Sequence, residues 1–280
     1  MPVLGLQLMM LRDQINEQGM YEVLRQVREL DLDAVEVSQV EMTDELIEDL
    51  VRGQADFGVE TAAMSASLTA PANGFALDSE FDRAVETCHR LGTRFLRIGM
   101  MPFEAMTSKQ ACEAWAADCE PVAARLAAQG ITLCYHNHHV DLIQFAGERI
   151  FDIVRRVAPS LLFEVDLHWV QRGGMAPLDM LEAYTGACKL IHVKDFRVAP
   201  FPRDVLERQA EMDRSEFMAA FVNLTQFAEV GQGNMNWPDL LPAAEKAGAE
   251  YFLIEQDDTY GRDPVDCIRE SREYLRSIGY

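Results

Sequence analysis

Short apolar stretches alternate with longer amphipathic stretches along most of the chain, and this alternation predicts strands and helices in turn. The apolar stretches are nearly continuous, which is typical of strands that are buried on both faces of a sheet. The predicted strands cover residues 3–11, 34–37, 60–68, 94–99, 131–138, 161–166, 189–193 and 251–255.

The amphipathic stretches repeat their apolar residues with helical spacing and carry helix start and stop signals. Thr43 has the character of an N-cap, while Gly92 and Gly130 end two of the predicted helices. The predicted helices cover residues 20–30, 44–50, 81–91, 108–129, 148–157, 177–184, 237–247 and 264–278.

Eight strands that alternate with helices predict an α/β fold, a (β/α)8 TIM barrel in which residues 1–280 form a single domain. A doubly wound open sheet is the alternative, but no G-x-G-x-x-G motif follows the first strand. After the seventh strand, Pro200 and Pro202 prevent a helix from starting. Residues 196–229 are therefore expected to form a long, partly helical excursion.

Composition narrows the classes of partner. The net charge of −21 argues against binding of nucleic acid through a broad basic surface, and gives little attraction to an anionic membrane. The chain has no apolar stretch of about 18 residues and no signal-peptide pattern. Its six scattered cysteines lack a C-x-x-C pair and are expected to stay reduced. We expect a cytoplasmic protein.

Potential metal ligands stand at the ends of the last four predicted strands. Catalytic groups of TIM barrels come from these ends, so the side chains are expected to meet. Imidazole and carboxylate together suit Mn²⁺, Zn²⁺, Fe²⁺ or Co²⁺ better than Mg²⁺ or Ca²⁺. A single such residue could simply be a polar strand end, but four successive strands make this explanation weak. The residues are His136, His138, Asp166, His168, His192, Lys194 and Glu255.

Other side chains near the strand ends are candidates for substrate binding. Arg97 could bind a carboxylate or phosphate, or could pair with an acidic neighbour. His168, two positions after the sixth-strand aspartate, is expected to share its strand face and to bind a substrate hydroxyl. Phe103, Trp169 and Trp237 could form apolar walls for a sugar, with core packing as the alternative for each.

Five motifs make the chain resemble the sugar phosphate isomerase/epimerase family of xylose-isomerase-like TIM barrels, in a branch with a Y-H-N-H motif. The motifs are Y-H-N-H at 135–138, F-E-V-D at 163–166, H-V-K-D at 192–195, G-Q-G at 231–233 and L-I-E at 253–255. The resemblance covers essentially the whole chain. It implies one metal ion, for which Asp166, His192 and Glu255 match three ligands and His136 takes the place of the usual glutamate.

The change from glutamate to histidine bears on the mechanism. In the epimerases of this family that glutamate is also one of two acid/base groups, so another group must move the proton. His138 is the first candidate, because an imidazole exchanges protons near neutral pH. Lys194 is the second, with a salt bridge to Asp195 or Glu255 as the alternative. His139, on the opposite strand face, is expected to be structural.

The resemblance implies a metal-dependent sugar or cyclitol isomerase or epimerase that removes a proton next to a carbonyl through a metal-stabilised enediolate, with Mn²⁺ the favoured ion. A lyase of the same chemistry, either an inosose-type dehydratase or a 3-oxo-glycoside or C-glycoside deglycosidase, is an alternative, as is a non-catalytic sugar-binding subunit. AP endonucleases share the superfamily, but the acidic charge argues against DNA. The expected partner is a small sugar, keto-sugar or cyclitol; a homo-oligomer or a hetero-oligomeric partner subunit is left open.

Overall fold

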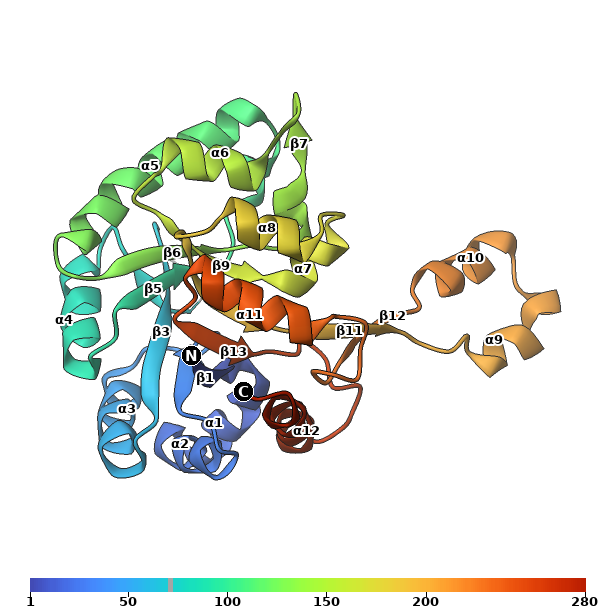
Figure 1. Cartoon of the computed structure of the whole chain (residues 1–280), viewed down its shortest axis with the longest axis horizontal. Coiled ribbons are helices and arrows are strands. Elements are labelled where there is room, and N and C mark those ends of the chain that lie inside the picture. Colours follow the sequence, from blue (N-terminus) through green and yellow to red (C-terminus); the bar gives the residue numbers. More distant parts are fainter. Residues whose placement is uncertain (70–72) are drawn as a thin grey trace.

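Eight parallel strands close into a barrel in the computed structural model, which describes residues 1–69 and 73–280 (Figure 1). The ring closes because β1 pairs with β13 on one side and with β2 on the other. The predicted (β/α)8 barrel is therefore confirmed. The barrel strands are β1 Val3–Gln7, β2 Ala34–Val37, β3 Glu60–Ser67, β5 Phe95–Ile98, β6 Thr132–His136, β9 Leu162–Asp166, β10 Cys188–Val193 and β13 Tyr251–Ile254.

Amphipathic helices surround the barrel and bury their apolar faces against it. The Thr43 side chain accepts a hydrogen bond from the N–H of Leu46, which confirms the predicted N-cap of α3. The main helices are α2 Met20–Glu29, α3 Asp44–Phe57, α4 Phe81–Leu91, α5 Lys109–Ala127, α6 Ile150–Val157, α8 Pro177–Ala183, α11 Trp237–Ala247 and α12 Pro264–Ser277. None of the helices in the described ranges is long and apolar enough to cross a membrane.

Short elements decorate the connections between strands and helices. They include the helices α1 Arg12–Gln18 and α7 Leu167–Arg172, and the strands β4 Phe75–Ala76, β7 Gln144–Phe145 and β8 Glu148–Arg149. The described residues also form the 3₁₀ helices η1 Leu8–Leu11, η2 Phe103–Met106, η3 His139–Leu142 and η4 Gln209–Glu211.

Two strands end two or more residues before the apolar pattern predicts. β1 stops at Gln7, because its side-chain oxygen accepts the N–H of Met9 at 2.6 Å and starts a 3₁₀ helix. β6 stops at His136 rather than at His138. β9 ends at Asp166, as predicted, because Oδ1 of Asp166 accepts the N–H of Trp169 at 2.9 Å and caps α7. In each case the residues beyond the strand remain largely buried, so burial alone could not mark the boundary.

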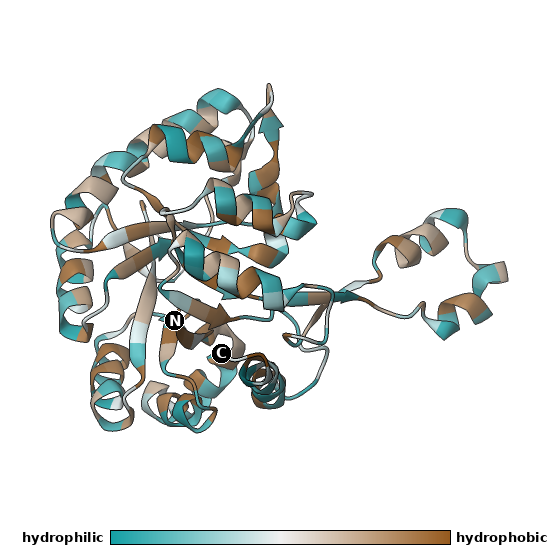
Figure 2. Cartoon of the chain, viewed as in Figure 1, coloured by the Kyte–Doolittle hydropathy of each residue, from teal (hydrophilic) through white to brown (hydrophobic). Residues whose placement is uncertain are grey.

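Between Asp195 and Ala228 the chain leaves the barrel and forms an arm. The strands β11 Asp195–Val198 and β12 Thr225–Ala228 pair antiparallel and carry α9 Arg203–Glu207 and α10 Arg214–Val222 at their far end. Figure 1 shows these helices projecting away from the barrel. Neither helix contains a buried residue. Figure 2 shows hydrophobic residues on both, and Leu206, Met218, Phe221 and Val222 are exposed.

Inside the barrel, an apolar layer supports a polar one. Successive inward side chains of a strand lie two residues apart, so each polar residue stands one step above an apolar residue of its own strand. The apolar layer includes Ala34, Phe95, Cys134, Leu190 and Leu253. The polar residues two positions further along the same strands are Glu36, Arg97, His136, His192 and Glu255. This polar layer is the floor of the candidate site.

Candidate metal centre

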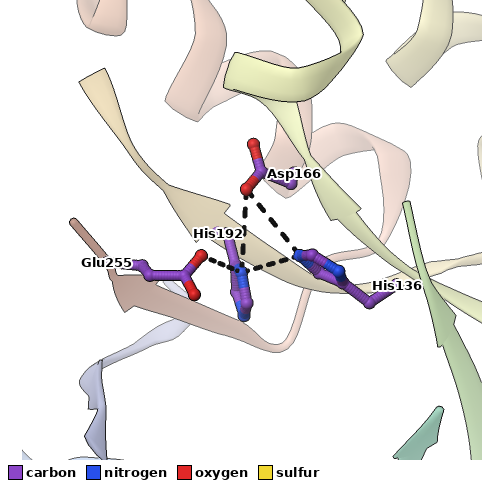
Figure 3. A group of neighbouring side chains, drawn as sticks. All are labelled: His136, Asp166, His192 and Glu255. Carbon is purple, nitrogen blue, oxygen red and sulfur yellow. Dashed lines mark hydrogen bonds and ion pairs between the residues drawn. The ribbon is translucent and has the colours of Figure 1, made fainter. Parts of the chain in front are cut away.

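Four buried side chains from neighbouring strands converge at the C-terminal end of the barrel (Figure 3). They are His136, Asp166, His192 and Glu255, the four ligands expected from the sequence. Nδ1 of His192 lies 3.0 Å from Nε2 of His136 and 2.7 Å from Oε2 of Glu255. Oδ2 of Asp166 lies 3.7 Å from Nε2 of His136 and 3.8 Å from Nδ1 of His192.

Three of these four separations match the coordination shell of one ion, whereas the 2.7 Å between Nδ1 of His192 and Oε2 of Glu255 is the length of a charge-assisted hydrogen bond. Ligand atoms about 2.0–2.2 Å from a metal are themselves roughly 3–4 Å apart. Oδ2 of Asp166 is also buried without a hydrogen-bond partner in the described part of the chain. Nζ of Lys194 lies 3.5 Å from this oxygen, at the limit of a hydrogen bond, so a metal ion at closer range would stabilise it further.

The hydrogen bonds of the two histidines leave one nitrogen of each ring facing the centre. Nδ1 of His136 faces the backbone oxygen of Gly99 at 3.2 Å, and Nε2 of His192 faces Oε2 of Glu36 at 3.0 Å. A carbonyl and a carboxylate only accept, so these nitrogens carry the hydrogens. Burial opposes a charge on His192, but the surrounding glutamates outweigh burial and raise its pKa, so a proton on Nδ1 satisfies the 3.0 Å contact between the inner nitrogens. A metal ion would take the place of that proton, and the outer hydrogen bonds are those that orient ligating histidines.

Beneath the four ligands lies a buried network of Arg97, Glu36 and Glu164. Nε of Arg97 donates to Oε1 of Glu36 at 2.7 Å and lies 3.3 Å from Oε2 of Glu164. Burial opposes ionisation of Glu36, but Arg97 and His192 outweigh it and lower its pKa. Burial and the charge of Glu36 raise the pKa of Glu164 to about 7. The pairing of Arg97 with acidic neighbours, one of its two expected roles, is present; substrate binding by Arg97 stays a prediction.

Replacing Arg97 with methionine should destabilise the protein strongly. Arg97 is 5% exposed, and its loss would leave Glu36 and Glu164 buried side by side without their cation. Removing one partner of a buried ion pair costs about 3–5 kcal/mol. We expect a loss of this size in the free energy of unfolding, measured by urea denaturation at pH 8.

The matched control is Arg90→Met, because Arg90 pairs with Glu48 at 2.7 Å on the surface. Its cost should stay below about 1 kcal/mol. In Arg97→Met the loss should grow as the pH rises above 7, because Arg97 lowers the pKa of Glu164, which is about 7 when Arg97 is present, and its removal makes ionisation of the buried Glu164 still less favourable. Equal losses in the two variants would show that the buried network contributes no special stability.

Lys194 lies beside the candidate metal ligands and is 1% exposed. Its Nζ lies 2.7 Å from Oδ2 of Asp257, 3.1 Å from Oε2 of Glu255 and 3.5 Å from Oδ2 of Asp166. Burial opposes its charge, but these carboxylates outweigh burial and raise its pKa. The expected salt bridge to Glu255 is therefore present. Lys194 is held protonated, as a donor rather than a base.

The position of His138 is fixed by hydrogen bonds that link it to Tyr135 of the Y-H-N-H segment through Asp141. The hydroxyl of Tyr135 donates to Asp141 Oδ1 at 2.5 Å, and Asp141 Oδ2 accepts the N–H of His138 at 2.7 Å. The rings of His138 and His136 lie 4.7 Å apart. Burial lowers the pKa of His138 to about 3, and its Nδ1 lacks a partner among the residues the structure describes. The ring is therefore neutral and offers a free nitrogen, but with so low a pKa it is a weak base near neutral pH.

Asn137 holds the backbone of a metal ligand. Its Nδ2 donates to the carbonyl oxygen of Asp166 at 3.2 Å, and its Oδ1 accepts the N–H of Asp166 at 2.9 Å. The clamp fixes the end of β9 against the end of β6. Within the motif, one histidine is a candidate ligand, the next a candidate base, and the asparagine a support for the neighbouring ligand.

His168 lies on α7 and not on a strand face, so the expected shared face with Asp166 is wrong. The strand ends at Asp166 because that residue caps the helix. The His168 ring is buried between Trp169, Phe196 and Phe227, with centroid distances of 4.7, 5.1 and 5.2 Å. Burial lowers its pKa to about 4. The substrate-binding roles of His168 and Trp169 stay predictions.

The comparisons with known proteins agree with this geometry. The model of the family described as xylose isomerase-like TIM barrel matches residues 24–278. The chain belongs to this family. No curated protein matches the chain.

Solved structures of the same fold cover nearly the whole xylose isomerase-like barrel. A sugar phosphate isomerase/epimerase from Parabacteroides distasonis ATCC 8503 has a TM-score of 0.74 at 18% identity, over 99% of this chain and 94% of that chain. The probable 3-DHS dehydratase AsbF from Bacillus anthracis has a TM-score of 0.70 at 14% identity, over 99% of both chains. The IOLI protein, crystallised with a zinc atom, has a TM-score of 0.68 at 15% identity, over 99% of this chain and 97% of that chain. At these identities the likeness shows the fold.

Asp195, the last residue of the H-V-K-D motif, has a structural role in this member of the family. Its carboxylate accepts the N–H groups of Gly231 at 3.0 Å and Met235 at 3.1 Å, and Nε1–H of Trp237 at 2.9 Å. A Cβ on Gly233 would lie 2.1 Å from Asp195 Oδ1. The G-Q-G turn therefore packs on Asp195, and Trp237 is a core residue. Asp195 makes no ion pair with Lys194, unlike the expected alternative.

A cavity of ≈740 Å³ opens above the candidate metal centre of this barrel. His136, His138, Lys194 and Glu255 border it, so candidate ligands and proton carriers face one space. Sequence reasoning missed two carboxylates here. Asp257 binds Lys194, and Glu36 orients His192. Glu36 was detectable, because it interrupts an otherwise apolar strand at an inward position.

Proposed function

We propose that this chain is a metal-dependent isomerase or epimerase of a sugar or cyclitol, acting by proton abstraction next to a carbonyl. The observation that carries the proposal is the convergence of four buried side chains, His136, Asp166, His192 and Glu255, whose ligand atoms all lie within 4.8 Å of one another. Together they form a donor set of two nitrogens and two oxygens. Its mixture of nitrogen and oxygen favours Mn²⁺, with Zn²⁺, Co²⁺ and Fe²⁺ as alternatives.

The residues around the centre would have separate roles in proton transfer. A bound divalent ion would polarise the substrate carbonyl and offset negative charge that develops on its oxygen. Neutral His138 would accept the proton from the adjacent carbon through Nδ1. Lys194 would donate a hydrogen bond to a substrate oxygen, while Gln7 holds Glu255 through a bond of 3.1 Å between Nε2 and Oε1.

Incubation of the Mn²⁺-reconstituted protein with ketoses and 3-keto sugars in D₂O tests the proposal. We expect deuterium on the carbon next to the carbonyl of an intact stereoisomer, detected by NMR and mass spectrometry. EDTA-treated protein serves as the control and should exchange no deuterium. A chain that binds these sugars but exchanges no deuterium, with or without metal, would be a sugar-binding barrel instead.

A lyase of the same chemistry is the second candidate, and the charge state of Lys194 favours it. Three carboxylates hold this lysine protonated, which leaves His138 as the one neutral base candidate beside the ligands in the described structure. Elimination needs one base, whereas inversion at carbon commonly uses two. Release of water or of an aglycone from a 3-keto substrate, in place of a stereoisomer, would identify the lyase.

A further inference from the structure

The described residues that line the cavity include few positive charges that are free to bind an anion. Two of them are cations, Arg97 and Lys194, and both already contact carboxylates. Arg97 pairs with Glu36 and Glu164, and Lys194 contacts Glu255 and Asp257. A phosphate would have to displace one of these buried partners, at the cost of an unpaired buried charge.

Carboxylates also outnumber cations on this wall. Asp118, Glu255 and Asp257 border the cavity beside the two cations. Even with a divalent ion at the centre, its carboxylate ligands offset most of its charge. The wall therefore disfavours a phosphorylated sugar, although several structural neighbours carry the words sugar phosphate in their names.

The remaining wall has a polar part and an apolar part. Hydroxyl and amide groups suited to sugar hydroxyls come from Ser38, Gln39, Ser65, Ser67 and Asn73. The apolar part is formed by Met9, Leu68, Met100, Pro102, Phe103 and Trp115. Phe103 is 70% exposed, and Met100 is 39% exposed. Because these side chains adjoin one another along the cavity, they form an apolar patch of the kind that marks ligand-binding grooves, rather than a single exposed ring.

The size of the cavity leaves room for more than one sugar ring. A hexose has twelve non-hydrogen atoms, and even at the ~30 Å³ that a water takes in the liquid they fill no more than about 360 Å³. The cavity measures ≈740 Å³. About half of it therefore stays open beside a bound hexose.

We propose that the substrate is an uncharged sugar or cyclitol that carries an aromatic or other apolar substituent, which packs against Phe103 and the methionines of the rim. The inference rests on the proposed function only in placing the sugar ring beside the metal centre. The polar wall binds the sugar hydroxyls, and the apolar rim binds the substituent. An aryl glycoside has both parts.

Calorimetric titration of the Mn²⁺-reconstituted protein tests this inference without requiring turnover. The ligands are D-glucose, D-galactose and D-xylose, each compared with its phosphate ester and its phenyl β-glycoside. For at least one sugar, the phenyl glycoside should bind tenfold or more tightly than the free sugar, and the phosphate ester no more tightly. A phosphate ester that binds tenfold more tightly than its free sugar would overturn the inference.

Phe103→Ala supplies the second measurement, with Phe221→Ala on the arm as its matched control, since both phenylalanines are exposed. Phe103→Ala should reduce the ratio of phenyl-glycoside affinity to free-sugar affinity at least threefold and leave the affinity for the free sugar unchanged. Phe221→Ala should alter neither. If the ratio of the two affinities is the same in Phe103→Ala as in the wild type, the inference is also overturned.

The outcomes separate the inference from the proposed function. Preference for phosphate esters, with metal-dependent deuterium exchange retained, refutes the substrate class alone. Absence of binding by all nine ligands also refutes the substrate class, while the deuterium exchange on keto sugars decides the proposed function separately. Preference for phenyl glycosides without metal-dependent exchange keeps the substrate class and refutes the isomerase.

Discussion

Asp166→Asn should remove the bound metal and abolish activity. The substitution replaces Oδ2, the buried oxygen that faces the two histidine nitrogens, by an amide N–H₂, which cannot ligate. The cap of α7 through Oδ1 can persist, so the fold should survive. Metal affinity should fall by more than the ~10–100-fold typical of losing an outer-shell partner. Metal content after reconstitution, determined by elemental analysis, measures the loss.

Asp118→Asn is the matched control, because this aspartate borders the same cavity without being one of the four converging ligands. It should retain full metal and a folded circular dichroism spectrum. If Asp166→Asn also retained stoichiometric metal, the four converging side chains would not be the metal site. The network under His192 would then be a structural ion cluster.

His138→Ala should leave the metal bound and slow turnover by about 10²–10⁴-fold, the usual contribution of a positioned acid or base. The ring lies beside His136, but its Nδ1 makes no hydrogen bond in the described structure, so truncation breaks no network. The measurement pairs metal content with kcat on the substrate found in the exchange experiment. Added imidazole should restore part of the rate.

The neighbouring His139 provides the comparison. It is exposed and its ring packs on Trp169 at 5.1 Å. His139→Ala should change kcat less than threefold. If His138→Ala kept the wild-type rate, the base would have to be sought elsewhere, with the Lys194 and Asp257 pair as the next group to replace.

Much of the barrel follows from local sequence signals. The strands are apolar runs of a length that suits burial on both faces, and caps such as Thr43 mark helix starts. α4 and α11 have the boundaries that the pattern predicts. The predictions fail where a side chain accepts a hydrogen bond from a backbone N–H two or three residues later and so ends the strand. Gln7 ends β1 in this way, and Asp166 places His168 on a helix rather than on a strand. Such bonds depend on geometry that periodicity does not encode.

The candidate ligands were predictable because the barrel brings the ends of its strands together. His136, Asp166, His192 and Glu255 each occupy a strand end, and their convergence follows from the fold. The partners of Lys194 were only partly predictable. Asp195 and Asp257 are both acidic, but which of them faces the lysine depends on how the chain turns after β10 and β13.

The geometry of the arm determines how well the chain tolerates insertions and deletions in this segment. Because β11 and β12 run antiparallel, Asp195 and Ala228 lie side by side, and the chain returns to the point from which it left. The segment beyond them can lengthen, shorten or be exchanged with little entropic cost and no shift in barrel register. Phe196 and Phe227, which enclose His168, belong to the two strands of the stem. The arm can therefore vary as a unit, while its stem packs against His168 and Lys194 beside the candidate metal centre.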